Sequence, residues 1–205
     1  ERMPYARRPL CAYAASKIAA ERAVLQADSA RLRTIAIRPH LVWGPGDHHL
    51  IPRLLERGRA GALKVVGDGT NRVDITYIDN AVQAHLRAAE NLAASASGAG
   101  QAFFIGQEEP VNLWSWINAL FARVDIPPVR QRVPFALAWC VGLALETVHA
   151  ALRLEREPRM TRFVAHQLAR SHWFNHRKAE NLLRYRPAIT TAEGVERLVA
   201  ALGHT

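Results

Sequence analysis

Residues 33–47 read RTIAIRPHLVWGPGD, and this stretch decides the fold class of the chain. Its first part, residues 33–39, is a short apolar run with β-branched residues that ends at proline, which predicts a buried strand. Its second part, residues 42–47, contains two glycines and a proline and predicts a turn directly after that strand. Open α/β sheets bind their ligands at the carboxyl ends of their strands, so we expect a ligand site at this turn.

The segments on either side indicate an α/β fold with a parallel sheet. Residues 13–26 have helical periodicity, and a helix that leads into a buried strand is half of a βαβ unit. Residues 72–78 alternate like a strand, Asp79 is expected to cap a helix over residues 80–92, and residues 102–106 predict one more buried strand. The rest is predicted to be mostly helical, with helices at residues 51–59, 113–124, 134–154, 162–170, 177–183 and 192–202.

Tyr13 and Lys17 are the candidate catalytic pair. Residues at positions i and i+4 lie on one face of a helix, so the two side chains are close enough to share a ligand. The positive charge of an ammonium favours the phenolate and lowers the pKa of a neighbouring tyrosine, which suits the phenol for proton transfer. The pair therefore predicts acid–base chemistry.

Composition narrows the range of partners. The net charge of +9 comes from 24 arginines and three lysines that are spread along the chain, so no nucleic-acid partner is expected. Cys11 and Cys140 form no disulfide framework, which favours a cytoplasmic location. His48 and His49 follow Asp47, but adjacent histidines do not converge easily on one ion, so no metal site is predicted.

Residues 134–145 carry no charge, and this run is too short to span a membrane. Three interpretations remain open for residues 134–154. They form a packed or hairpin-forming helix, an apolar lid over the substrate, or a segment that contacts a membrane surface near Arg153, Arg156 and Arg159. The third interpretation would make the protein peripherally membrane-associated.

Four segments in this order resemble an extended short-chain dehydrogenase/reductase of the 3β-hydroxysteroid dehydrogenase-like branch. They are Tyr13-x-x-x-Lys17, RPHLVWGPGD at 38–47, GDGTNRVD at 67–74, and TYIDNA at 76–81 with His85 after it. The resemblance covers essentially the whole chain. It implies the C-terminal part of a Rossmann-like parallel sheet with a smaller, mostly helical substrate domain. Residues 1–44 and 74–106 would be the remainder of the dinucleotide-binding domain, and residues 45–73 and 107–205 the substrate-binding part.

The resemblance also implies NAD or NADP as cofactor and the interconversion of a ketone and a secondary alcohol. Tyr13 would be the acid–base group, and Lys17 would bind the hydroxyls of the nicotinamide ribose. The segment expected to lie against the nicotinamide is Pro39, His40, Leu41 and Val42. A homodimer through a helix bundle that includes the Tyr13 helix is also implied.

The substrate is expected to be small and apolar, because residues 134–154 are rich in large apolar side chains, Trp139 among them. A sterol-like 3β-hydroxy or 3-keto compound and a long-chain 2-alkyl-3-oxoalkanoate are the two candidates. Arg72 matches a position that binds diphosphate in nucleotide-sugar relatives, although an ion pair with a local carboxylate is an alternative role. A nucleotide-sugar epimerase or dehydratase, and a non-catalytic nucleotide-binding relative, remain alternative functions.

Two expected features of such enzymes are absent from the sequence. The glycine-rich fingerprint that binds the dinucleotide is missing, and nothing before Tyr13 matches the family's catalytic serine or threonine. We therefore expect this chain to be a piece of a longer enzyme. By itself it should bind the cofactor poorly and turn nothing over.

Overall fold

The computed structural model describes residues 4–7, 9–154 and 158–203. Its contacts divide the chain into two compact units. The sheet unit comprises Glu1–Ile51, Asp74–Pro110 and Phe174–Thr205, and the helical unit comprises Pro52–Val73 and Val111–Trp173. Residues 174–205 thus group with the sheet unit, whereas the sequence assigned all of 107–205 to the substrate-binding part. The functional roles of the two units remain predictions.

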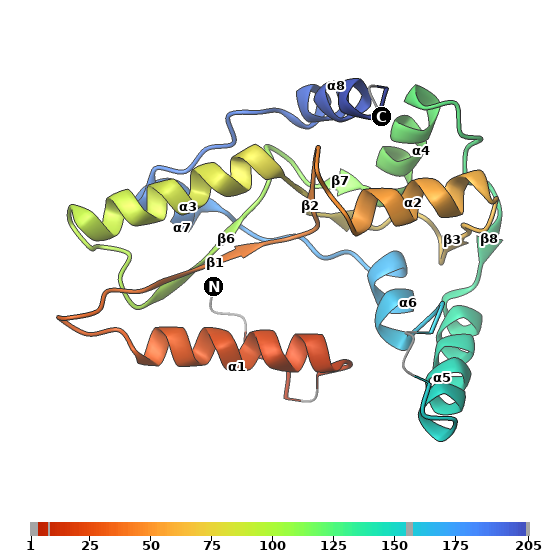
Figure 1. Cartoon of the computed structure of the whole chain (residues 1–205), viewed down its shortest axis with the longest axis horizontal. Helices are drawn as coiled ribbons and strands as arrows, with labels where there is room; N and C mark the ends of the chain where they lie inside the picture. Colours follow the sequence, from red (N-terminus) through yellow and green to blue (C-terminus); the bar gives the residue numbers. More distant parts are fainter. Residues whose placement is uncertain (1–3, 8, 155–157, 204–205) are drawn as a thin grey trace. The chain divides into compact units, whose positions relative to one another are not determined.

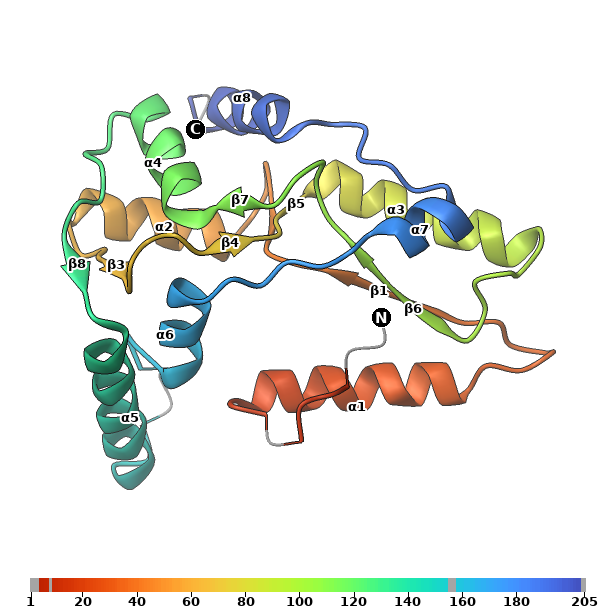
Figure 2. The ribbon, with the colours of Figure 1, turned by 180° about the vertical axis from the view of Figure 1, so that it is seen from behind.

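The sheet unit is built around a parallel strand pair, as the helix-then-strand order predicts. Strand β1 (Ile35–Pro39) runs parallel to β6 (Gln101–Ile105), with Pro39 opposite Ile105. Helices α1 (Ala12–Gln26) and α3 (Ile78–Ala93) lie on opposite sides of this pair (Figure 1). Helix α7 (Arg177–Leu183) lies beside α3 and β6 (Figure 2). The core beneath α3 consists of alanines on this helix and of residues on β6, on α7 and just after α7: Ala81, Ala84, Ala88, Phe103, Ile105, Ala179, Leu183 and Tyr185.

A second parallel pair joins β2 (Val42–Trp43), which occupies the first two residues of the turn predicted at 42–47, to β5 (Thr76–Tyr77). The rings of Trp43 and Tyr77 are fully buried and meet edge to face, with centroids 5.2 Å apart. Helix α8 (Thr191–Leu202) packs against both rings through Gly194. The predicted α/β class with parallel strands is confirmed.

Two local predictions are wrong. Residues 72–78 are not one strand, because β4 (Arg72–Val73) pairs antiparallel with β7 (Val111–Asn112) while β5 pairs with β2. Asp74 separates them: it is 1% exposed, and its Oδ2 accepts a hydrogen bond from the Phe174 N–H at 2.8 Å. A buried carboxylate needs such partners, and supplying them interrupts the alternation of the strand.

The second wrong prediction concerns the start of α3. The helix begins at Ile78, with Tyr77 as its N-cap, so Asp79 does not cap it. Asp79 lies in the first turn, where a negative charge interacts favourably with the helix dipole. Its Oδ2 accepts from Arg197 on α8 at 3.1 Å.

The helical unit contains most of α2 (Leu50–Arg59), and α4 (Leu113–Arg123), α5 (Phe135–Ala151) and α6 (Arg162–Ala169). This unit also has three short strands that the sequence did not predict, β3 (Val65–Val66), β7 and β8 (Arg132–Val133). Strand β7 pairs with β4, and β8 pairs with β3. The side chain of Asn112 caps α4 by accepting from the Ser115 N–H at 2.8 Å. The predicted mostly helical character of this part is confirmed.

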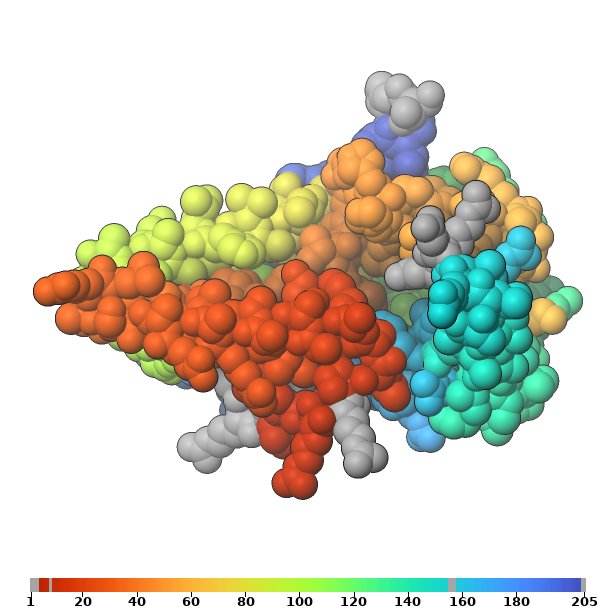
Figure 3. All heavy atoms as spheres, turned by 60° about the horizontal axis from the view of Figure 1, so that its bottom comes forward, coloured from red at the N-terminus to blue at the C-terminus, as the bar shows by residue number. Residues whose placement is uncertain are grey.

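Helices α5 and α6 form a tightly packed pair. A Cβ on Gly142 would lie 2.6 Å from the Thr161 carbonyl carbon, so only glycine permits this approach. Glu146 accepts from the backbone N–H of Arg162 at 2.7 Å and from its Nε at 2.6 Å. Helix α5 is the blue-green part of the surface in Figure 3. Several of its large apolar side chains are exposed: Leu137, Val141, Leu143 and Val148. No helix among the described residues is both long enough and apolar enough to cross a bilayer.

Candidate active site

Helix α1 presents Tyr13 and Lys17 on one face, as the i, i+4 spacing predicts. The Lys17 Nζ lies 5.5 Å from the centroid of the Tyr13 ring. The Tyr13 side chain is 65% exposed, so the phenol is accessible to a ligand. The helix supplies the geometry, because alanines and other good helix formers surround the pair.

An ion pair fixes α1 against β1. Arg38 donates from Nε to Glu21 Oε2 at 2.7 Å and from Nη2 to Glu21 Oε1 at 2.5 Å. The Tyr5 hydroxyl also donates to Glu21 Oε1. The hydrogen bonds from Arg38 are the main reason that the pKa of Glu21 lies below its ordinary value. The helix that carries Tyr13 is therefore held to the strand that leads into residues 39–42.

The segment from Pro39 to Val42 forms a turn at the carboxyl end of β1, where the sequence predicts a ligand. Leu41 has a φ of 43°, a left-handed conformation that is unusual for a residue with a side chain. The Leu41 carbonyl accepts from the Thr76 N–H at 3.2 Å. The Thr76 hydroxyl lies 3.3 Å from the His40 N and 3.1 Å from the His40 O. The sequence analysis did not select Thr76, since nothing in its local pattern distinguishes it from an ordinary strand residue.

The side chain of Phe174 lies beside His40. The Phe174 ring meets the His40 ring edge to face, with centroids 6.0 Å apart. Phe174 also stacks on Phe104 at 3.9 Å, and the Arg38 guanidinium lies 4.8 Å from the centre of the Phe104 ring. This packing gives the turn one apolar side.

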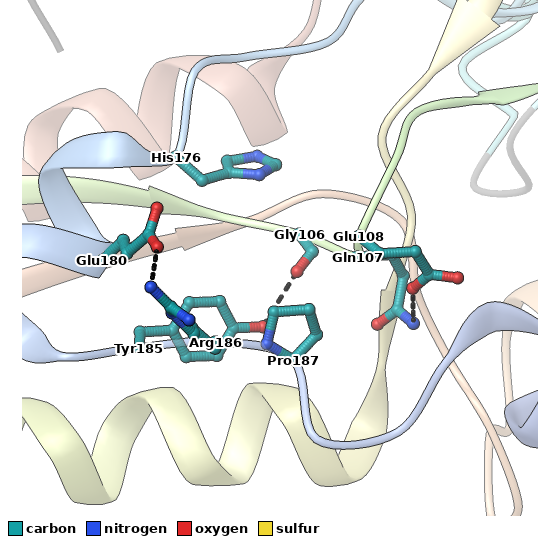
Figure 4. A pocket seen from close by; sticks show the side chains of 8 residues that line it. All are labelled: Gly106, Gln107, Glu108, His176, Glu180, Tyr185, Arg186 and Pro187. Carbon is teal, nitrogen blue, oxygen red and sulfur yellow. Dashed lines mark hydrogen bonds and ion pairs between the residues drawn. The ribbon is translucent and has the colours of Figure 1, made fainter.

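A pocket of about 330 Å³ lies at the carboxyl end of β6 (Figure 4). The Tyr185 hydroxyl donates to the Gly106 carbonyl at 2.9 Å, and burial raises the pKa of this phenol. The His176 ring occupies the space next to Gly106, and its Nε2 lies 3.0 Å from Asp74 Oδ2. The pocket is lined by Gly106, Gln107, Glu108, His176, Glu180, Tyr185, Arg186 and Pro187. None of the predicted site residues lines this pocket. The one sequence signal that points to the pocket is its position directly after a predicted buried strand.

The two predicted substrate residues lie in the helical unit. The Arg72 backbone N–H donates to Ser171 Oγ at 3.0 Å, and the Arg72 carbonyl accepts from the His172 N–H at 2.9 Å. The Arg162 guanidinium lies 5.8 Å from the centre of the Trp139 ring. These contacts explain how both segments are held, and the ligand roles of Arg72 and Trp139 remain predictions.

Asp47, beside the two adjacent histidines, has a structural role. Its Oδ1 accepts from the His49 N–H at 2.7 Å, and its Oδ2 accepts from the Ile51 N–H at 2.9 Å. The carboxylate thus satisfies amide groups at the start of α2. In the described part of the chain, no three histidine, cysteine or carboxylate residues are grouped as a metal ion requires.

The order of these segments agrees with a known family. Residues 1–137 match the 3-beta hydroxysteroid dehydrogenase/isomerase family. The chain belongs to this family. It is 45% identical over 201 residues to the 2-alkyl-3-oxoalkanoate reductase of Stenotrophomonas maltophilia, covering 98% of this chain and 61% of that protein. It is 34% identical over 209 residues to the mouse (Mus musculus) sterol-4-alpha-carboxylate 3-dehydrogenase, decarboxylating, covering 100% of this chain and 58% of that protein.

Solved structures show the same fold. The UDP-glucuronic acid 4-epimerase of Bacillus cereus, solved in complex with NAD, superposes with a TM-score of 0.63 at 18% identity. The match covers 96% of this chain and 54% of the epimerase. This likeness confirms the predicted Rossmann-like architecture, and the family match over residues 1–137 confirms the predicted 3β-hydroxysteroid dehydrogenase-like assignment. The chain spans less than two thirds of the length of the relatives it matches.

Proposed function

We propose that the complete protein containing this chain is an NAD- or NADP-dependent oxidoreductase that interconverts a ketone and a secondary alcohol on an apolar substrate. The observation that carries the proposal is the placement of Tyr13 and Lys17 on one accessible face of α1 in a member of this family. A phenol and an ammonium in this arrangement can transfer a proton to or from a substrate oxygen.

Each predicted residue has a role in this reaction. When bound, the nicotinamide supplies or accepts the hydride. Tyr13 protonates the carbonyl oxygen in the direction of reduction and takes the hydroxyl proton in the direction of oxidation. Lys17 binds the ribose hydroxyls and places a positive charge beside the phenolate. The backbone of the 39–42 turn holds the carboxamide.

The residues present fit the nicotinamide end of the cofactor. An exposed ammonium and phenol match ribose hydroxyls, and the turn offers backbone groups next to the apolar ring of Phe174. The glycine-rich cradle for the diphosphate is not in this chain. This chain alone is therefore expected to bind the cofactor weakly and to be inactive.

The substrate is proposed to be either a long-chain 2-alkyl-3-oxoalkanoate or a sterol-like 3-keto or 3β-hydroxy compound. The more similar of the two relatives above is named for the first class, and the mouse relative is named for the second. The apolar side chains of α5, including Trp139, suit both better than a nucleotide sugar.

A substrate panel with the complete protein tests this proposal. Oxidation of NADH or NADPH is measured with a long-chain 2-alkyl-3-oxoalkanoate and with a 3-ketosteroid. Conversion of a UDP-sugar is followed by chromatography of the products, because epimerisation and dehydration consume no cofactor overall. We expect turnover with one of the first two compounds. Turnover with the UDP-sugar alone would replace the proposal with the epimerase or dehydratase alternative. Cofactor binding without turnover of any compound would favour the non-catalytic alternative.

We further propose that the protein contacts a membrane surface through α5. The outer face of α5 carries large exposed apolar side chains: Leu137, Val141, Leu143 and Val148. Its ionisable residues Glu146 and His149 lie instead on the half-buried side, where Glu146 pairs with Arg162. Solvated helices normally carry charges on the outer face. An uncharged apolar face of this kind suits the boundary between lipid headgroups and acyl chains.

A homodimer through α1 is the remaining partner proposal. Within the described part of the chain, no residue of α1 is buried. The helix therefore has a face that a second copy of the chain can cover. Light scattering of the complete protein should give the mass of a dimer, and a monomer at micromolar concentration would contradict this proposal.

A further inference from the structure

Thr76 lies where β1 and β6 end and where β2 and β5 begin. It starts β5, it pairs with Val42 of β2, and its side chain is fully buried. Its hydroxyl lies 3.1 Å from the His40 carbonyl oxygen and 3.4 Å from the Ile105 carbonyl oxygen, at the carboxyl ends of β1 and β6. One buried side chain therefore contacts the backbone at the edge where ligands bind to such sheets.

The contacts of Thr76 enclose a strained turn. Its hydroxyl accepts from the His40 N–H at 3.3 Å and donates to the His40 carbonyl, and its own N–H donates to the Leu41 carbonyl at 3.2 Å. Leu41 is left-handed, and a leucine in this conformation costs about 1 kcal/mol or more. Strained residues persist when their surroundings hold them in place. The Thr76 hydroxyl therefore contacts the backbone of His40, and the Thr76 N–H contacts the backbone of Leu41.

We propose that Thr76 is a positioning residue, whose buried hydroxyl fixes the backbone of His40 and Leu41 for contact with the nicotinamide. This inference rests on the proposed function, in which the 39–42 turn holds the carboxamide. Thr76 does not touch the reacting atoms. Its hydroxyl keeps the 39–42 turn in the conformation that directs backbone groups toward the ligand. Because these groups are ordered before the ligand binds, the entropic cost of binding is lower.

The inference predicts a selective loss of affinity. Thr76→Val replaces the hydroxyl with a methyl group of similar size, so that packing is retained while both hydroxyl contacts with His40 are lost. We expect the dissociation constant for the preferred nicotinamide cofactor to rise roughly five- to tenfold, the effect of about one hydrogen bond. ADP-ribose, or its 2′-phosphate when NADP is preferred, lacks the nicotinamide and should bind Thr76→Val as tightly as it binds the wild type.

Calorimetric titration of the complete protein with both ligands is the test. An equal loss of affinity for the two ligands would show a general structural effect and overturn the inference, as would unchanged affinity for the cofactor. If Thr76→Val fails to fold, Thr76→Ser and Thr76→Ala form a second matched pair, since both lack the methyl group and only the serine keeps the hydroxyl. The serine variant should then bind the cofactor more tightly than the alanine variant, and equal binding would contradict the inference. Failure of the wild type to bind either cofactor would instead refute the proposed function.

Discussion

At the scale of single residues, the ion pair between Glu21 and Arg38 connects α1, the helix of Tyr13 and Lys17, to strand β1. The two side chains are 15% and 18% exposed, respectively, and two hydrogen bonds join them. Pairs that are this well shielded and bidentate contribute more to stability than exposed ion pairs. Their position implies that Tyr13 is held relative to β1 through Glu21.

This geometry predicts a pH-dependent effect of Glu21→Gln. Because the pKa of Glu21 is below its ordinary value in the folded protein, the carboxylate stabilises the fold above about pH 4.5, and this contribution is lost as pH falls through the lower folded-state value. Denaturant unfolding at pH 7 should show a loss of roughly 1–3 kcal/mol for the variant. The difference from the wild type should shrink as pH falls below 4.5.

The matched control is Glu90→Gln, which removes an exposed ion pair with Arg87 on α3. It should cost less than about 1 kcal/mol at any pH. An equal loss for Glu21→Gln and Glu90→Gln at pH 7, or a Glu21 effect that grows on acidification, would contradict this role of Glu21.

The sequence predicts contacts between neighbours on one helix and misses contacts between distant segments. Tyr13 and Lys17 are four positions apart, so helical periodicity alone places them together. Thr76 is 36 positions from His40, and Asp74 is 102 positions from His176, so their contacts depend on tertiary structure. Local spacing carries no information about such pairs.

At the scale of elements, α8 illustrates how a glycine is selected by packing. A Cβ on Gly194 would lie 2.8 Å from Tyr77 Cδ2 and 2.9 Å from Trp43 Cη2. Both rings are buried, so neither can move away without disturbing the core. The helical periodicity of residues 192–202 predicts the helix, but it does not show why a poor helix former lies inside it.

Gly194→Ala should therefore destabilise the protein, although alanine favours helices by about 1 kcal/mol over glycine. Overpacking of a core typically costs about 1–3 kcal/mol, which exceeds that gain. A thermal melt should show a lower Tm for Gly194→Ala. The control is Gly203→Ala at the end of the same helix, where the nearest atom to an added Cβ is 3.7 Å away. A higher Tm for Gly194→Ala would refute this packing.

The remaining elements divide into those that the sequence predicts and those set by tertiary contacts. Long periodic segments such as α1, α3 and α4 are found within a few residues of their predicted bounds. The strand expected at residues 72–78 is split because Asp74 accepts from Phe174, a hundred positions away. The two-residue strands β7 and β8 are too short to show any periodicity.

At the scale of the whole molecule, charge is distributed unevenly between the two units. The helical unit has 13 arginines and lysines and 6 acidic residues, so it carries +7 of the chain's net charge of +9. Because α5 belongs to the same unit, the exposed apolar helix face occurs on the strongly basic part of the chain. Anionic lipid attracts basic protein surfaces by about 1 kcal/mol per nearby lysine or arginine. The combination favours an anionic bilayer over a neutral one as the partner of α5.

Sedimentation with lipid vesicles tests this partner. The complete protein should bind vesicles of phosphatidylcholine with phosphatidylglycerol more strongly than pure phosphatidylcholine, and added salt should weaken binding. Val141→Glu and Val148→Glu place a charge on the outer face of α5 and should reduce the bound fraction several-fold. Val82→Glu introduces the same charge at an exposed site on α3 and should have little effect.

Two outcomes would contradict the membrane contact. One is equal binding to both kinds of vesicle, and the other is an equal effect of the α3 and α5 variants. If Val141→Glu instead changes the mass of the protein in solution without changing vesicle binding, α5 is covered by a second copy of the chain.

The proposed nicotinamide-dependent reaction requires Tyr13 to transfer the proton, and replacing its hydroxyl tests this role. Turnover and cofactor affinity are compared between the complete wild-type protein and Tyr13→Phe, with the ketone that the substrate panel selects. We predict that Tyr13→Phe lowers kcat by about 10²-fold or more while the Kd for NADH or NADPH stays nearly unchanged, because the ring is kept and only the hydroxyl is lost. Full activity of Tyr13→Phe would contradict the account.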